Sequence, residues 1–158
     1  MGRTAVLGFG NPVRSDDAVG CHIVELLQQR FAGNDDITFI DMGTSSFEVL
    51  FQLQGHDRLI LVDATVNSGE EVGTIFKLPA KEVMSAPQED PMVFLHSLKW
   101  DQALSYAKKI LRDDYPGDID VYLIAVDNIK LEVNMSPEVK SAAEKVVNLV
   151  ADDLIAMA

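Results

Sequence analysis

Residues 4–17 read TAVLGFGNPVRSDD, and this stretch decides the fold class. Its first six residues form a short apolar run that ends among glycines, which is typical of a buried parallel strand running into a tight loop. Asp16 and Asp17 then open a segment in which apolar residues recur at helical spacing as far as Phe31. A buried strand followed at once by an amphipathic helix predicts the first half of a β-α-β unit.

The remaining sequence repeats this alternation of strand and helix patterns. Further strands are predicted at residues 37–40, 58–64, 73–78 and 119–126. Helices are predicted after Ser45, at residues 98–111 and from Ser136 towards Leu154, with a long loop over residues 79–95. The order β-α-β-α-β-β-α-β-α predicts an α/β fold with a mostly parallel sheet that helices cover on both faces.

Composition excludes several classes of protein. A chain of 158 residues fits one domain, residues 1–158. Its 25 Asp and Glu against 13 Lys and Arg give a formal charge of -12, a field that repels nucleic acids and anionic membranes. No apolar run approaches the roughly 18 residues of a membrane span, and no signal peptide is apparent, so we expect a cytoplasmic protein. The single cysteine, Cys21, excludes intrachain disulfides and Cys-based zinc sites.

Acidic residues stand at three predicted strand ends. Asp16 and Asp17 follow the first strand, Asp41 ends the second and Asp63 ends the third. Individually they could be helix caps or loop formers, with Asp16 as an N-cap and Asp17 as a first-turn acid. Together they would repel one another unless a cation or proton compensates, so the cluster predicts a metal site or a raised-pKa acid. His96, just before a helix, could add an imidazole ligand.

Two other interpretations concern the first loop and the first helix. Gly8 and Gly10 begin a G-x-G-x-x-G pattern, but Val13 replaces its third glycine and two acids follow, which weakens the case for a nucleotide site. Cys21 is better explained as a small buried residue than as a nucleophile, because no base is apparent beside it.

The chain resembles the hydrogenase maturation proteases, endopeptidases that trim the C-terminus of the large subunit of [NiFe] hydrogenases. The resembling elements occur in the family's order: Gly8-Phe9-Gly10-Asn11, Asp16-Asp17-Ala18-Val19-Gly20, Asp41-Met42-Gly43-Thr44, Leu61-Val62-Asp63-Ala64, Gly73-Thr74 and Phe94-Leu95-His96-Ser97-Leu98. Val72 and Ser45-Ser46 depart from residues common in the family, and both concern the shape of loops.

This resemblance implies an α/β sandwich with a five-stranded sheet and an aspartyl endopeptidase activity. It implies metal contacts at Asp17, Asp63 and His96, and catalytic roles for Asp17 and Asp41. The metal would be nickel supplied by the substrate, the hydrogenase large-subunit precursor, with no organic cofactor, and we expect a monomer. Whether the metal or Asp41 activates the attacking water stays open. The alternatives are a metal-binding chaperone that does not cleave and a nucleotide-binding α/β enzyme that uses Gly8 and Gly10.

Overall fold

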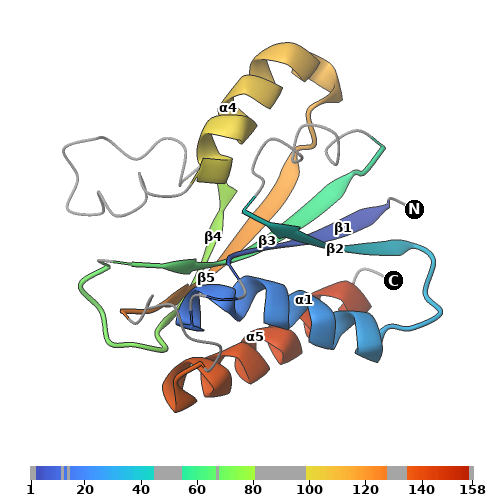
Figure 1. Ribbon diagram of the computed structural model, residues 1–158. Coiled ribbons are helices and arrows are strands. Elements are labelled where there is room, and N and C mark those ends of the chain that lie inside the picture. Colours follow the sequence, from blue (N-terminus) through green and yellow to red (C-terminus); the bar gives the residue numbers. More distant parts are fainter. Residues whose placement is uncertain are drawn as a thin grey trace.

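The computed structural model describes residues 3–11, 13, 15–44, 55–66, 68–80, 99–127 and 135–156 (Figure 1). Its strands are β1 (Thr4–Phe9), β2 (Ile37–Gly43), β3 (Arg58–Thr65), β4 (Ile75–Pro79) and β5 (Asp118–Ala125). Its helices are α1 (Val19–Arg30), α4 (Lys99–Leu111) and α5 (Pro137–Ala156), with 3-10 turns η1 (Ser15–Ala18) and η3 (Arg112–Asp114). The helix predicted after Ser45 and most of the predicted loop over 79–95 lie outside the described residues.

The five strands form one sheet in the order β2-β1-β3-β5-β4. β1 pairs in parallel with β2 and β3, and β3 pairs in parallel with β5. β4 is antiparallel to β5 and forms one edge, while β2 forms the other. The predicted mostly parallel α/β sheet is therefore confirmed, and the carboxyl ends of four strands meet at one side of the molecule.

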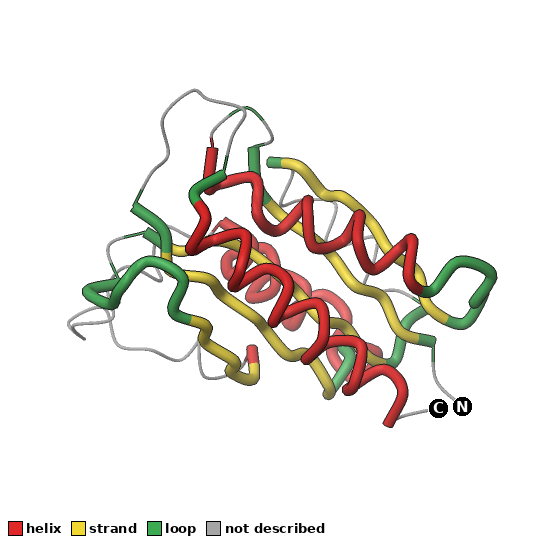
Figure 2. The backbone as a smooth tube through the Cα atoms, turned by 90° about the horizontal axis from the view of Figure 1, so that it is seen from below, coloured by secondary structure: helices red, strands yellow, loops and turns green. Residues whose placement is uncertain are grey.

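Helices cover both faces of the sheet. α1 and α5 lie side by side on one face and α4 lies on the other (Figures 1 and 2). Along β3, Leu59 and Leu61 pack into the core under α4, whereas Ile60 and Val62 pack into the core under α1 and α5. This strict alternation requires a strand with apolar residues on both sides, which explains why the parallel strands read as continuous apolar runs. None of the described helices is long and apolar enough to cross a membrane.

Polar contacts hold the C-terminal end of α5 against the sheet. The Tyr122 hydroxyl of β5 donates a hydrogen bond to Asp153 of α5, and Lys77 Nζ of β4 lies 3.0 Å from the same carboxylate. Burial by itself raises the pKa of Asp153, but the hydrogen bonds from Tyr122 and Lys77 outweigh it and hold that pKa below its ordinary value. The charged form of Asp153 is therefore the one that stabilises this contact.

Candidate active site

Glycines bring α1 directly onto the ends of the central strands. A Cβ atom on Gly20 would lie 2.2 Å from the carbonyl oxygen of Phe9, and one on Gly8 would lie 2.4 Å from that of Gly20. Gly10 has a φ of +146°, and a Cβ there would lie 2.0 Å from the Asp17 carbonyl oxygen. Any side chain at these positions would push the helix away. The glycines of the first loop thus serve backbone packing, which removes the main support for a nucleotide site.

Asp16 connects this loop to the start of α5. Its side chain is fully buried, and it accepts hydrogen bonds from the Ser136 N–H at 2.6 Å and from the Ser136 hydroxyl at 2.9 Å. The interpretation of Asp16 as the N-cap of its own helix is wrong, because the N-cap of α1 is Ala18 and has no side-chain cap. Asp16 is therefore a structural residue that joins segments 120 positions apart.

Asp17 and Asp41 are both oriented by backbone N–H groups. Asp17 Oδ2 accepts a hydrogen bond from the Asn11 N–H at 3.1 Å, and Asp41 Oδ1 accepts one from the Gly43 N–H at 2.9 Å. Asp17 is half-buried, while Asp41 is exposed at the carboxyl end of β2. Each carboxylate is held in place and still meets solvent, which suits a group that contacts a substrate.

Asp63 lies at the same end of the sheet as Asp41, but its side chain is on the opposite face. It is 9% exposed, and its Oδ1 accepts a hydrogen bond from the Ala64 N–H at 2.8 Å. Because side chains alternate along a strand, Asp63 shares the α4 side of β3 with Leu61. Asp41 shares the α1 side of β2 with Phe39, which packs against the core under α1 and α5. A ligand of both acids would have to span the end of β1.

The predicted metal contacts are only partly within the described residues. Asp17 and Asp63 are described, whereas His96 lies outside. Within the ranges that the structure describes, no three His, Cys, Asp or Glu side chains are grouped so that they could hold a metal ion. The set of Asp17, Asp63 and His96 therefore stays a prediction.

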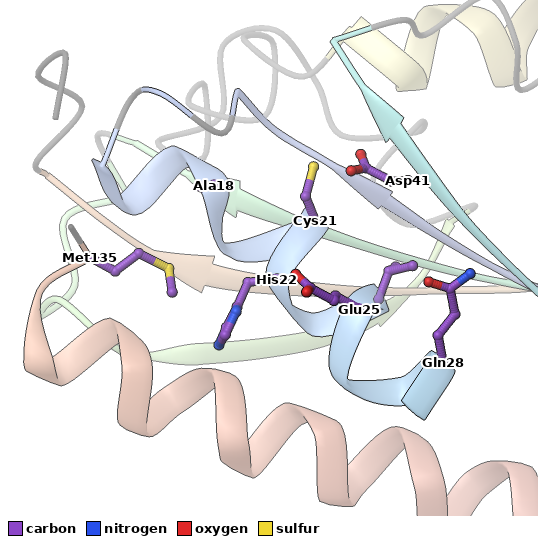
Figure 3. A pocket seen from close by; sticks show the side chains of 8 residues that line it. Ala18, Cys21, His22, Glu25, Gln28, Asp41 and Met135 are labelled. Atoms are coloured by element: carbon purple, nitrogen blue, oxygen red, sulfur yellow. The ribbon is translucent and has the colours of Figure 1, made fainter. Parts of the chain in front are cut away.

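Cys21 is buried beside Asp41, as Figure 3 shows. Its Sγ lies 3.5 Å from the Gly10 carbonyl oxygen, to which the thiol donates. Burial raises the pKa of the Cys21 thiol, and the nearby negative charge of Asp41 raises it further. The thiol is therefore protonated at neutral pH, which agrees with its interpretation as a buried residue and not a nucleophile.

A pocket of about 320 Å³ follows α1 next to Asp41 (Figure 3). Glu25 and Gln28 line it from the helix, and Met135 borders it from the segment before α5. Sequence reasoning missed this pocket, because its residues look like the solvated face of an amphipathic helix. Only the edge position of β2, which depends on strand order, brings Asp41 beside them.

Comparison with known proteins agrees on one family. The family model for hydrogenase maturation protease matches residues 21–153. The hydrogenase 2 maturation protease of Escherichia coli (strain K12) is 29% identical over 145 residues, which cover 90% of this chain and 84% of the relative.

Solved structures give the same result for the fold. The hydrogenase maturating endopeptidase HybD from E. coli superposes with a TM-score of 0.81 at 25% identity, covering 98% of this chain and 93% of that one. The solution structure of an endopeptidase from Escherichia coli gives 0.78 at 27% identity, covering 94% and 89%. The likeness extends over nearly the whole chain, and the expected α/β fold is confirmed.

Proposed function

The chain belongs to the hydrogenase maturation protease family, whose members are peptidases, and on this premise we propose that it removes the C-terminal extension of a [NiFe] hydrogenase large-subunit precursor after nickel has been inserted. The observation that supports this proposal most is the placement of Asp41 and Asp63 near the carboxyl ends of β2 and β3 and of Asp17 in the 3-10 turn that follows β1, the strand between them. In parallel α/β sheets this is the side where ligands bind.

Asp17, Asp63 and His96 would contact the nickel of the precursor. Carboxylate oxygens and an imidazole nitrogen are suitable ligands for such a divalent ion. Asp63 is buried and Asp17 is half-buried, and burial of a negative charge is costly until the substrate brings a positive charge. The precursor that carries nickel would therefore bind more tightly than the empty precursor.

Asp41 would act as the general base in hydrolysis. It would accept a proton from water as the water oxygen attacks the scissile carbonyl carbon, and that proton would reach the amine of the leaving peptide. The hydrogen bond from the Gly43 N–H orients the carboxylate, and its exposure gives a substrate access. The products are a carboxylate on the mature subunit and a free amine on the released peptide.

The test is mass spectrometry of the precursor after incubation with the protein, with and without nickel. We expect loss of the extension only with nickel, and strongly reduced rates for Asp41→Asn, Asp63→Asn and His96→Ala. Asp152→Asn, on the exposed side of α5, is the matched control and should keep the wild-type rate. Wild-type rates in Asp63→Asn and His96→Ala would overturn the metal assignment. Binding without any change in mass would instead identify a chaperone.

A further inference from the structure

The outer edge of β2 presents backbone groups that the sheet does not use. β2 is an edge strand, and no described strand pairs with its outer side. The Thr4 N–H donates a hydrogen bond to the Asp36 carbonyl oxygen at 3.3 Å, so the even-numbered residues from Asp36 onwards direct their backbone groups towards β1. Since backbone groups alternate in direction along a strand, those of Ile37, Phe39 and Asp41 point away from β1. Such a row is a template for another extended chain.

The surface next to this edge is negatively charged. The pocket along α1 contains Glu25, which is exposed, and Asp41 at the end of the strand. Asp35 and Asp36 are exposed just before the strand begins. Among the described residues that line the pocket, His22 is the only one that can carry a positive charge. An extended segment that lies here gains from Lys or Arg side chains, whereas an acidic segment is repelled.

We propose that the edge of β2 and the pocket along α1 bind an extended, positively charged segment of the precursor, as an additional strand beside Ile37, Phe39 and Asp41. This inference rests on the proposed function and specifies where its substrate lies. Because Asp41 belongs both to this edge and to the candidate active site, a segment paired along β2 is delivered to the carboxylate that would act as the base.

Gln28 of α1 already contacts the outer edge of β2, so its removal should strengthen binding of the precursor. Gln28 Nε2 donates to the Phe39 carbonyl oxygen over 3.4 Å, so Gln28 occupies a position that the incoming strand needs. Gln28→Ala removes this competitor, and we expect the KM for the precursor to fall about twofold with kcat unchanged. Gln29→Ala, an exposed position on the same helix, is the control and should leave KM unchanged.

Charge is tested at Glu25. Glu25→Lys replaces attraction of a basic segment by repulsion, and we expect KM to rise about fivefold with kcat unchanged, an effect that weakens in high salt. Glu144→Lys makes the same charge change on the exposed side of α5 and should leave KM as it is. Unchanged KM in both Gln28→Ala and Glu25→Lys, while the wild type processes the precursor, would overturn the docking surface and leave the proposed function intact. Absence of processing by the wild type would instead overturn the proposed function.

Amide hydrogen exchange reads the backbone pairing directly, without cleavage. With nickel-free precursor as the probe, the N–H groups of Ile37, Phe39 and Asp41 should exchange more slowly, whereas those of β4 at the opposite edge should not change. Exchange at these three amides that stays the same at saturating precursor would contradict strand addition.

Discussion

Replacing Asp16 tests whether the buried acid of the first loop is structural. The carboxylate is fully buried and accepts two hydrogen bonds from Ser136, at 2.6 Å and 2.9 Å. Hydrogen bonds to charged groups contribute about 1.5–3 kcal/mol each, and a deleted acceptor leaves buried donors unpaired. Asp16→Ala should therefore lower the free energy of unfolding by about 3–5 kcal/mol, a large share of the usual total of about 5–15 kcal/mol.

Urea unfolding followed by circular dichroism measures this loss. With a slope of about 2 kcal/mol per M, the midpoint should fall by roughly 1.5–2.5 M. Ser136→Ala removes only the hydroxyl bond and should cost about half as much. Because both residues form one contact, the double variant should be much less destabilised than the sum of the single ones.

Asp17→Asn separates the structural acid, Asp16, from an acid that we propose to contact the substrate. Among the described residues, Asp17 accepts one hydrogen bond, from the Asn11 N–H, and it is half-buried. Its replacement should therefore change stability by about 1 kcal/mol or less while processing falls sharply. A cost below about 1 kcal/mol for Asp16→Ala, or an equal cost for the two variants, would refute the reasoning.

Three further outcomes follow from the packing. Gly20→Ala should destabilise by about 3 kcal/mol or more in chemical unfolding, because its Cβ would lie 2.2 Å from a carbonyl oxygen, whereas Gly117→Ala, with nothing within 4 Å, should change stability by less than about 0.5 kcal/mol. The pKa of Asp153 is held below its ordinary value of 3.8, so its ion pair and hydrogen bond stabilise the fold at pH values above 3.8 and lose this effect as the pH falls below that value. The free energy of unfolding of the wild type should exceed that of Asp153→Asn by about 1–2 kcal/mol at pH 7, and this difference should shrink towards pH 3. A difference that stays constant with pH would contradict the assignment. Native Cys21 should react with iodoacetamide at pH 8 more than about tenfold more slowly than the urea-unfolded chain, and equal rates would show that the thiol is neither buried nor raised in pKa.

Strand positions could be predicted closely because buried parallel strands have a simple signature. Thr4–Phe9 was predicted with the observed bounds, since an apolar run is followed at once by glycines. The end of β2 was predicted too early, with the apolar run ending at Ile40 and Asp41 as the end of the strand, because the strand continues to Gly43. Its register with β1 shifts at this point, a tertiary feature that composition does not reveal.

The acids at the strand ends were predicted as a group, but their individual roles were not. Chain order places Asp16, Asp17, Asp41 and Asp63 at one end of the sheet. Chain order does not show that Asp16 bonds to Ser136, 120 residues later, or that the side chains of Asp41 and Asp63 lie on opposite faces of the sheet. Those distinctions depend on strand order and on the phase of each pleat, which only the assembled sheet determines.

The contact between Asp16 and Ser136 has a consequence for synthesis on the ribosome. The loop that carries Asp17 is anchored through its neighbour to a residue 120 positions later, near the C-terminal helix. During translation, which proceeds at about 5–20 residues per second, this contact cannot form until residue 136 has emerged. Truncated products that lack Ser136 and the last helix would keep the first strand and its acids but not this contact, so we expect the loop that carries Asp17 to be less firmly held in them.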